Sequence, residues 1–288
     1  MMRILLIGGS GMLGVEVQKQ LQSTSLEVVS PRSSELDIRD FDLLSTYLSH
    51  NKPEWIINCA AWADVVRAED EFEAACELNF KGPYNLAIAA GQYGCTVIQI
   101  STDYVFNGMR ANAYVEDSET SPINNYGASK ELGEKALLEN LPKAGYVLRT
   151  SWLYGVNGNN FVKTIAEKAL KQESVQVVND QIGSPTNARD LAGAIVSLIN
   201  TAPEPGIYHY SNTGSCSWFE FAQSIYALAG SDPNLVEAVD SEAFNSKVRR
   251  PKYSLLSKEK WISAGLSEVP NWEDSLQLIM PEIISELQ

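Results

Sequence analysis

The 288-residue sequence predicts an α/β fold, a doubly wound parallel sheet covered by helices on both faces. Short apolar runs of strand length recur through the first half, and each is separated from the next by a segment long enough to form a helix. A glycine-rich turn directly follows the first of these runs, as in a strand-turn-helix unit. Strands that are apolar along their whole length are buried on both faces, which is typical of parallel sheets.

The expected strands are short and rich in apolar or β-branched residues. They cover residues 4–7, 27–30, 55–58, 96–101 and 146–149. Helices are expected where apolar residues recur with a helical period, or where a capping residue such as Asp40 precedes the segment. They cover residues 12–23, 40–51, 67–77, 80–94 and 126–140. This alternation predicts right-handed crossover connections and therefore a Rossmann-type layer.

A second, smaller and interleaved unit is expected after residue 151, where the pattern becomes less regular. Residues 155–160 form a Gly- and Asn-rich loop, and residues 174–186 resemble a strand followed by a turn. A helix over residues 188–200 and a strand over 206–211 are expected to return to the first sheet. The helices of the C-terminal third are expected to form a lid beside the carboxyl edge of the sheet, where ligands of α/β folds bind. The aromatic residues of these helices are Trp218, Phe221, Tyr226, Trp261 and Trp272.

The composition favours a globular protein that binds small molecules. Hydrophobic residues make up 44% of the chain, and the formal net charge of -14 repels nucleic acid and anionic membrane surfaces. The four cysteines form no C-x-x-C pair and the chain has two histidines, so we expect reduced thiols and no zinc site. No apolar run is long enough for a secretory signal or a membrane span, and we expect a cytoplasmic protein.

Gly8, Gly11 and Gly14 follow the first expected strand at intervals of three residues and open an expected helix. Glycine lets backbone N–H groups approach an anion closely, and a helix N-terminus carries about half a positive charge. This arrangement predicts a site for the pyrophosphate of a dinucleotide. The alternative is a tight strand-to-helix turn that uses glycine without binding a ligand.

Tyr126 and Lys130 lie at positions i and i+4 of an expected helix, so their side chains share one face. A lysine cation nearby favours the phenolate and lowers the tyrosine pKa from about 10 toward neutral pH. A phenol tuned in this way is suited to donate a proton to a carbonyl oxygen during its reduction. The alternative is a chance pair, because this spacing arises often in chains of this size.

The strand over residues 96–101 ends in hydroxyl residues that belong to the same site. Ser101 or Thr102 lies at the carboxyl edge of the sheet, where a hydroxyl can hydrogen-bond the substrate oxygen. Asp103 is expected to cap the turn that follows rather than to react. Tyr104 and Phe106 are expected to be packing residues.

The end of the second expected strand indicates which dinucleotide is bound. A site that prefers NAD places Asp or Glu there to bind the ribose 2′-hydroxyl. This chain has Ser30, Pro31, Arg32 and Ser33 instead. No carboxylate of this segment repels a 2′-phosphate, and Arg32 can bind one with the two serines, so we predict a preference for NADPH. The alternative is that Arg32 is a solvated surface charge.

Several motifs occur in register along nearly the whole chain. They are Gly8-x-x-Gly11-x-x-Gly14, Leu36-Asp37-Ile38, Asn58-Cys59-Ala60-Ala61, Ser101-Thr102-Asp103-Tyr104-Val105-Phe106, Tyr126-x-x-x-Lys130, Arg149-Thr150-Ser151-Trp152, Asn160-Phe161-Val162, Asp180-Gln181-x-Gly183-Ser184-Pro185-Thr186 and Arg250-Pro251. On these motifs the chain resembles the extended short-chain dehydrogenases/reductases and, among them, the dTDP-4-dehydrorhamnose reductase family. The resemblance implies NADPH-dependent reduction of the 4-keto group of dTDP-4-dehydro-L-rhamnose to dTDP-L-rhamnose, in nucleotide-sugar and cell-surface polysaccharide biosynthesis.

The resemblance also implies roles for individual residues. Tyr126 protonates the developing alkoxide, Lys130 binds the nicotinamide ribose and lowers the tyrosine pKa, and Thr102 orients the carbonyl. The implied cofactor-binding residues are Gly8, Ser10, Gly11, Met12, Leu13, Gly14, Arg32, Asp37, Ile38, Ala60, Ala61, Tyr126 and Lys130. The implied substrate-binding residues are Val65, Thr102, Asp103, Trp152, Asn160 and Arg250. Asn160 and Arg250 are suited to bind the diphosphate, because both supply donors to phosphate oxygens.

The chain departs from the family in the loop after residues 58–61. Val66 stands at a position that is commonly acidic, and Asp64 lies two places earlier. Some members hold magnesium through acidic residues at a dimer interface. Glu16 matches one of these positions and Asp190 only approximates another, which leaves magnesium, and the choice between monomer and homodimer, open.

These assignments divide the chain into two domains and leave two alternative functions open. Residues 1–153 are expected to form an NADPH-binding Rossmann domain to which residues 187–215 return, with NADH as a weaker substitute. Residues 154–186 and 216–288 are expected to form the substrate-binding domain. The alternatives are another nucleotide-sugar reductase or epimerase of the superfamily, and a non-catalytic regulatory subunit that binds a dinucleotide. The presence of the catalytic trio favours an enzyme.

Overall fold

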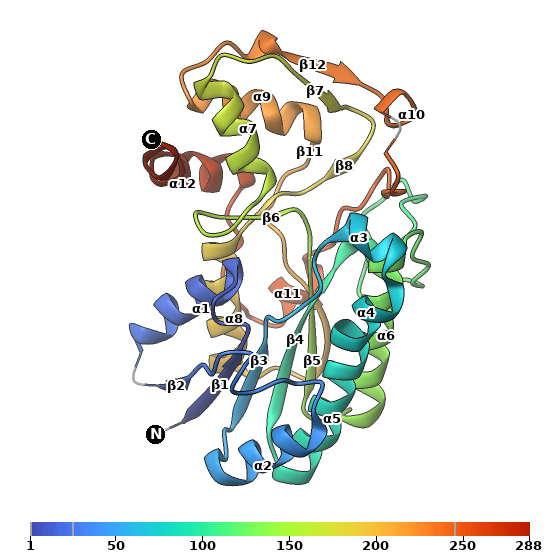
Figure 1. The fold of residues 1–288 in the computed structure, drawn as a ribbon, viewed down its shortest axis with the longest axis vertical. Helices are drawn as coiled ribbons and strands as arrows, with labels where there is room; N and C mark the ends of the chain where they lie inside the picture. The colour runs from blue at the N-terminus through green and yellow to red at the C-terminus, as the bar shows by residue number, and fades with distance from the viewer. Residues whose placement is uncertain (1, 25, 245) are drawn as a thin grey trace.

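The computed structural model describes residues 2–24, 26–244 and 246–288 and contains a central parallel sheet. Within these residues the sheet has six strands in the order β10-β5-β4-β3-β1-β2 (Figure 1). Their bounds are β1 Arg3–Ile7, β2 Glu27–Val29, β3 Trp55–Asn58, β4 Thr96–Thr102, β5 Gly145–Thr150 and β10 Gly206–His209. All neighbouring pairs are parallel, which confirms the predicted fold class.

Helices cover both faces of this sheet because its strands alternate their apolar side chains between the two faces. Ile4 and Leu6 belong to a core shared with α1 (Met12–Gln22) and α8 (Ala188–Thr201). Leu5 and Ile7 belong to a second core on the opposite face. The helices packed there are α2 (Phe41–Asn51), α5 (Gly82–Tyr93) and α6 (Asn125–Asn140). The carboxyl ends of the strands therefore meet at a single edge between two helical layers.

The helix expected over residues 67–77 is wrong as a continuous element. The structure has α3 (Val65–Asp70) and α4 (Phe72–Cys76), with Glu71 between them at φ −120° and ψ 45°, outside the helical region. A π-helical turn, η1 (Glu77–Lys81), then leads into α5. The Asp64 side chain caps α3 by accepting a hydrogen bond from the Arg67 N–H. The break at Glu71 and the π-turn change the direction in which the side chains of η1, that of Asn79 among them, point.

The second region lies above the carboxyl edge of the sheet in Figure 1 and has its own core. Its helices are α7 (Phe161–Leu170), α9 (Trp218–Leu228) and α12 (Trp272–Leu287). Its short strands pair as β7 (Val175–Val178) with β12 (Val236–Val239), β8 (Ile182–Gly183) with β11 (Cys216–Ser217), and β6 (Leu153–Tyr154) with β9 (Thr186–Asn187). The remaining short turns are η2 (Asp103–Val105), η3 (Pro233–Leu235) and α10 (Ser241–Phe244).

Trp261 corrects the expectation that all of residues 216–288 belong to the second region. It lies in α11 (Glu259–Ser263) and is fully buried in the core of the main sheet, with its ring centroid 5.0 Å from that of Tyr210. The chain returns to the sheet because residue Leu256 forms a bridge with Tyr114, and α11 then packs beside β10. Leu266 is buried in the same core. This segment therefore belongs with the sheet, and the rest of the expected division stays a prediction.

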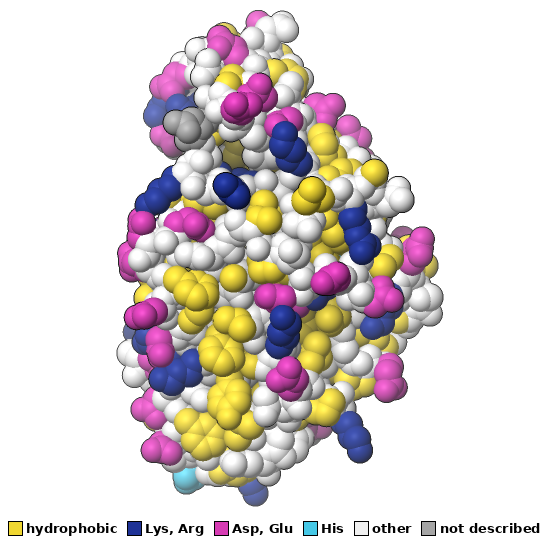
Figure 2. Space-filling view, turned by 90° about the vertical axis from the view of Figure 1, so that its right-hand side faces the viewer, with side chains coloured by type: hydrophobic (Ala, Val, Ile, Leu, Met, Phe, Trp, Pro, Cys, Tyr) yellow, Lys and Arg dark blue, Asp and Glu magenta, His cyan; other side chains and the backbone are white. Residues whose placement is uncertain are grey.

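The outer face formed by α4, α5 and α6 is partly apolar. Figure 2 shows this side of the molecule, where hydrophobic side chains form a band among charged ones. Exposed large hydrophobic residues of these elements and of η1 include Phe80, Tyr84, Tyr93 and Leu132. None of the helices in the described parts of the chain is both long and apolar enough to cross a membrane.

Candidate active site

The glycine turn after β1 is shaped by close backbone contacts. Gly8 has φ +76°, and a Cβ there would lie 2.6 Å from the Ala60 backbone nitrogen. A Cβ on Gly14 would lie 2.2 Å from the Gly8 carbonyl oxygen. Gly11 is the N-cap of α1 and has no side chain that could cap the helix. The backbone N–H groups at the start of α1 therefore face the glycine turn. These residues fit a pyrophosphate, as the glycine spacing predicts.

A cavity of about 290 Å³ lies beside this turn and is lined by six of the thirteen predicted cofactor residues. Its lining includes Gly8, Ser10, Arg32, Asp37, Ile38 and Ala60, together with Ser30 and Ser33. The Arg39 guanidinium donates to both carboxylate oxygens of Asp37, from Nε to Oδ1 at 2.9 Å and to Oδ2 at 3.1 Å, and from Nη2 to Oδ2 at 2.6 Å. The hydrogen bond from Arg39 lowers the pKa of the Asp37 carboxyl, so the carboxylate is held charged beside the cavity.

Two residues of this cavity were not predicted from the sequence. Gly9 lies so close to the end of β2 that a Cβ there would be 2.0 Å from the Ser30 hydroxyl oxygen. Gln18 lines the cavity from α1, and its Nε2 donates to the Gly9 carbonyl at 2.9 Å. Gly9 directly follows Gly8 in the sequence, but only the approach of β2 shows why it must be small.

The predicted catalytic residues lie together at the carboxyl edge of the sheet. Thr102 ends β4, and its hydroxyl accepts a hydrogen bond from the Tyr104 N–H at 3.1 Å. Tyr126 lies in the first turn of α6, which Asn124 caps, and hydrogen-bonds the Thr102 side chain. Lys130 lies one turn later, and its Nζ donates to the Ile100 carbonyl of β4 at 2.7 Å. The packing of α6 on β4 thus assembles the trio.

The expectation that Lys130 lowers the tyrosine pKa is wrong for this arrangement. Burial raises the pKa of Tyr126 to about 12, although the hydrogen bond with Thr102 opposes the rise. Burial also lowers the pKa of Lys130 to about 8, opposed by the negative charge of Glu134 and by Cys59. Desolvation outweighs the attraction between the two groups, which spacing along the chain does not reveal. Tyr126 is therefore a protonated phenol at neutral pH and can act as a proton donor.

Asn79 is a further residue of the site that sequence reasoning missed. It lies in η1 and is 1% exposed. Its amide donates to the Ser129 hydroxyl at 2.9 Å and to the Trp62 carbonyl at 3.0 Å, while its oxygen accepts from the Trp62 N–H at 2.8 Å. The side chain thereby ties the loop after β3 to the helix of Tyr126 and Lys130.

Asp103 is a buried carboxyl beside the catalytic hydroxyl. Thr102 donates to its Oδ1 at 3.1 Å, and within the described residues its Oδ2 has no hydrogen-bond partner. Burial raises its pKa to about 7, opposed by hydrogen bonds with Ser254 and Thr102. The carboxyl therefore changes charge near neutral pH, beyond the capping role expected from the sequence.

We expect Asp103→Asn to change the pH dependence of stability. The folded-state pKa is raised, so wild-type stability is fully present below the unfolded-state pKa near ~4 and is lost as pH rises toward 7. The variant has no such group. Its free energy of unfolding relative to wild type should increase by on the order of 2–4 kcal/mol between pH 4 and pH 8. Urea unfolding across this range measures the difference, and parallel curves for the two proteins would contradict it.

A larger cavity of about 570 Å³ opens beside the catalytic trio, toward the second region. It is lined by the predicted residues Val65 and Arg250 and by Tyr104, Phe161 and Trp218, which were not predicted. Tyr104 was expected only to pack, yet its ring also lies edge-on to that of Tyr126, with centroids 5.9 Å apart. Phe106 does pack, stacked on Tyr114 in a small core.

Trp152 stands behind this cavity in an unusual conformation. It has φ +47°, a region that bulky residues rarely adopt. Its ring stacks on that of Trp218, with centroids 3.6 Å apart and 11° between the planes. A Cβ on Gly183 would lie 2.5 Å from the Trp152 ring, so that glycine makes room for it. The stacked pair forms a rigid aromatic wall.

A third cavity, of about 540 Å³, shares Arg250 with the cavity of about 570 Å³ and is lined by two further cations. Arg249 and Lys252 line it, and the Arg250 Nη1 donates to the Ser246 hydroxyl at 2.6 Å. Three cations within four residues make this cavity suited to a diphosphate, although the whole chain is acidic.

Asn160, Glu16 and Asp190 line none of these three cavities and bind other parts of the chain instead. Asn160 caps α7 by accepting from the Lys163 N–H at 3.1 Å and donates to the Gly155 carbonyl at 2.8 Å, so its amide serves the chain itself. Glu16 accepts from Lys19 at 2.7 Å and Asn157 at 3.1 Å, and Asp190 accepts from Asn212 at 2.7 Å. No group of three or more His, Cys, Asp or Glu residues in the described ranges could hold a metal ion.

A glycine turn on a parallel sheet and a Tyr-Lys pair at its carboxyl edge define a Rossmann-fold oxidoreductase of the short-chain dehydrogenase/reductase type. The family model described as "RmlD substrate binding domain" matches residues 2–284. A dTDP-4-dehydrorhamnose reductase of Streptomyces griseus is 39% identical over 286 residues, 98% of this chain and 94% of the relative. The chain belongs to the dTDP-4-dehydrorhamnose reductase family.

Two further relatives concern the cofactor and the range of substrates. The crystal structure of dTDP-4-dehydrorhamnose reductase from Bacillus anthracis in complex with NADP has a TM-score of 0.93 and 40% identity, covering 98% of this chain and 99% of that chain. A Streptomyces niveus relative named dTDP-4-keto-6-deoxy-D-glucose reductase is 36% identical over 97% of this chain and 96% of its own length. The names of these relatives thus include more than one 4-keto sugar.

Proposed function

We propose that this oxidoreductase uses NADPH to reduce the 4-keto group of dTDP-4-dehydro-L-rhamnose to dTDP-L-rhamnose. The observation that carries the proposal is the meeting of Thr102, Tyr126 and Lys130 next to Tyr104, which lines a cavity together with Arg250. A substrate carbonyl bound next to Thr102, Tyr126 and Lys130 can accept a proton from Tyr126. A diphosphate placed along the cavity meets a guanidinium, whose fork matches phosphate oxygens.

In this mechanism the protein supplies the proton, the charge and the orientation. When bound, NADPH supplies the hydride to the carbonyl carbon. Tyr126, whose pKa of about 12 keeps it protonated, donates its phenolic proton to the carbonyl oxygen. Thr102 orients the same oxygen, and Lys130 binds the nicotinamide ribose with its ammonium group. Thr102 and Lys130 are buried and Tyr126 is partly buried, and this limited access of water strengthens each of these interactions.

The cofactor site supports NADPH through its positive and hydroxyl side chains. Arg32, Ser30 and Ser33 line the cavity beside the glycine turn. An epimerase that retains NAD places a carboxylate at this point, and residues 30–33 contain none. The same proposal places the substrate in the region built by residues 154–186 and by most of 216–288, and takes a small nucleotide sugar as the partner.

The proposal is tested by measuring loss of NADPH absorbance with a panel of 4-keto-6-deoxy sugars carrying TDP, UDP, GDP or CDP. We expect the highest kcat/KM with dTDP-4-dehydro-L-rhamnose, and a product whose NMR coupling constants identify dTDP-L-rhamnose. A higher value with the D-sugar epimer or with another base would replace the proposed substrate. No turnover with any sugar, together with tight binding of the dinucleotide, would favour the regulatory subunit.

We expect Arg32→Ala to lower the ratio of kcat/KM with NADPH to kcat/KM with NADH. A charged hydrogen bond to the 2′-phosphate contributes about 1.5–3 kcal/mol, so the ratio should fall roughly tenfold to a hundredfold. The value with NADH serves as the internal control and should stay near that of wild type, because NADH lacks the 2′-phosphate. An unchanged ratio would show that Arg32 is only a surface charge.

A further inference from the structure

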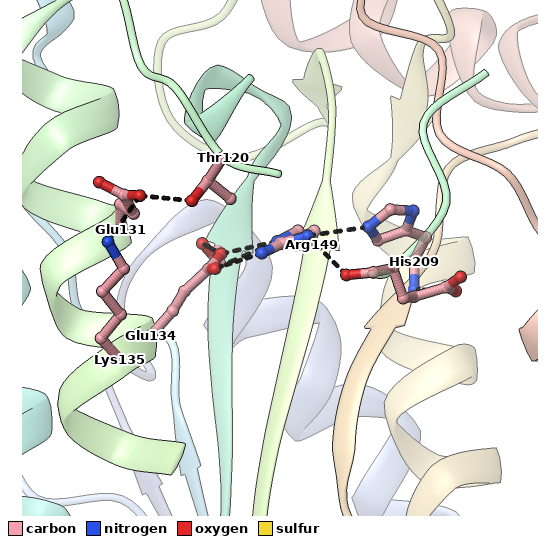
Figure 3. Close-up of polar contacts among 8 residues, drawn as sticks. Thr120, Glu131, Glu134, Lys135, Arg149 and His209 are labelled. Atoms are coloured by element: carbon pink, nitrogen blue, oxygen red, sulfur yellow. Dashed lines mark hydrogen bonds and ion pairs between the residues drawn. The ribbon is translucent and has the colours of Figure 1, made fainter. Parts of the chain in front are cut away.

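A buried ion pair lies directly behind the predicted catalytic lysine. Glu134 follows Lys130 by one turn of α6 and is 3% exposed, while Arg149 of β5 is 2% exposed. The Arg149 Nε donates to Glu134 Oε1 at 2.9 Å, and its Nη2 donates to Oε2 at 2.6 Å. Figure 3 shows the guanidinium extended between Glu134 on one side and His209 on the other. The Ser101 hydroxyl also donates to Glu134 Oε1.

The remaining contacts of Arg149 keep it fixed without adding another charge. His209 places its Nδ1 3.1 Å from the Tyr114 carbonyl, which assigns the ring proton to Nδ1. Its Nε2 is then free to accept from the Arg149 Nη1 at 3.4 Å. Burial and the charge of Arg149 lower the pKa of His209 well below its usual value, so the ring stays neutral. Nη1 also donates to the Glu116 carbonyl at 3.3 Å.

This network reaches Lys130 through two consecutive residues of β4. Ile100 accepts the hydrogen bond from the Lys130 Nζ, and Ser101 donates one to the Glu134 carboxylate. Lys130 and Glu134 are also at positions i and i+4 of α6, which places them on the same side of the helix. The ammonium and the carboxylate therefore face the same short segment of β4, inside the protein, where charge interactions are weakly screened.

The charged groups around Lys130 and Glu134 show that the Glu134 carboxylate affects the pKa of Lys130. Cys59 after β3 acts on Lys130, and Arg149 of β5 binds Glu134. His209 of β10 and Glu116 of the loop before α6 interact with Arg149. The Glu134 carboxylate binds Arg149 directly and acts on Lys130 through its charge. Burial lowers the pKa of Lys130, and Glu134 is the first group that opposes this effect.

We propose that Glu134 is a positioning residue that keeps Lys130 charged and directed at the cofactor site, and that Arg149 and Ser101 hold its carboxylate in place. Buried ion pairs contribute little net stability on average, because desolvation offsets their attraction. A role in tuning the neighbouring lysine gives this pair a function beyond packing. The inference rests on the proposed function, since it concerns the lysine that binds the nicotinamide ribose.

The test is the pH dependence of NADPH affinity in Glu134→Gln, measured by nicotinamide fluorescence without any sugar. Lys130 has a pKa of about 8, so wild-type affinity should weaken above that pH. Removal of the carboxylate charge should move this weakening to lower pH by ~1 unit or more. At alkaline pH the protonated fraction, and with it the affinity, should then be roughly tenfold lower, whereas affinity at pH 6 should match wild type.

A matched control exists one turn earlier on the same helix. The carboxylate of Glu131 binds Lys135 at 2.8 Å and the Thr120 hydroxyl, apart from the Glu134–Arg149 pair (Figure 3). Glu131→Gln removes the same charge from α6 and should leave the pH profile of NADPH binding at its wild-type position. An equal shift in both variants would overturn the proposal, because a general change in the charge of α6 would then explain it.

A second variant guards against poor folding of Glu134→Gln, which leaves Arg149 without its anion. Glu134→Gln/Arg149→Met removes both charges and should still shift the profile to lower pH. The proposal would be overturned if either folded variant had the same pH profile of NADPH affinity as the wild-type protein. It would also be overturned if the NADPH affinity of the wild-type protein did not change between pH 6 and pH 9. A protein that binds NADPH with the expected pH dependence but reduces no keto sugar would contradict the proposed function alone.

Discussion

Tyr126→Phe should lower kcat by about 10²–10⁴-fold while NADPH affinity stays within a few-fold of wild type. The substitution removes only the hydroxyl that is proposed to protonate the carbonyl oxygen. The phenyl ring keeps its edge-on contact with Tyr104, whose centroid lies 5.9 Å away, so the local packing is preserved. Lys130 still donates to the Ile100 carbonyl and remains available to the cofactor.

Steady-state kinetics with saturating NADPH, and cofactor binding measured separately, check this result. Tyr93→Phe is the matched control, since it removes a hydroxyl that hydrogen-bonds Ser45 at 3.0 Å on the outer face of α5. That variant should keep wild-type kcat. A kcat near wild type in Tyr126→Phe would show that another group donates the proton, and a loss of NADPH binding would indicate a structural role instead.

The sheet was predictable because each of its strands is a short apolar run with a helix-length segment after it. Residues 4–7 divide their side chains between two cores, and periodicity carries this information directly. The return of residues 206–209 to the edge of the sheet was also expected correctly. The break at Glu71 and the π-turn after it depend on how the segment packs, which a local pattern of apolar residues does not encode.

Trp261 is a second case in which a local sequence pattern does not predict the packing, here between segments far apart in the chain. Its aromatic character indicates burial but not against which core, and the sequence offered the second region as the nearer partner. The bridge between Tyr114 and Leu256 brings the chain back to the sheet, a contact between segments far apart in sequence. Domain membership of this segment is therefore a tertiary property.

In the candidate site, residue identity was predictable and electrostatics was not. The positions of Thr102, Tyr126 and Lys130 follow from a strand end and a helical spacing. The pKa of Tyr126 depends instead on burial, and burial raises it where the sequence suggested a fall. One sequence signal for the network that contains Glu134 was present, because Arg149 is the only charged residue of β5 and a buried arginine requires an anion.

Gly14→Ala should weaken NADPH binding by more than about tenfold and lower the free energy of unfolding by roughly 1–3 kcal/mol. The added Cβ would lie 2.2 Å from the Gly8 carbonyl oxygen and 2.6 Å from the Gly9 Cα. These are backbone atoms of the turn itself, so relief of the contact moves the N–H groups that are proposed to bind the pyrophosphate. The gain in helix propensity from glycine to alanine, about 1 kcal/mol, offsets only part of the strain.

The same substitution in α8 separates the close approach from the general effect of replacing a helical glycine. A Cβ on Gly193 meets no atom within 4 Å, although α8 packs against α1. Gly193→Ala should therefore stabilise the protein by about 0.5–1 kcal/mol and leave NADPH affinity unchanged. Urea unfolding and fluorescence titration measure both quantities in both variants. If Gly14→Ala behaved like Gly193→Ala, the glycine turn would tolerate a side chain, and it would not be the close-fitting cradle that the pyrophosphate site requires.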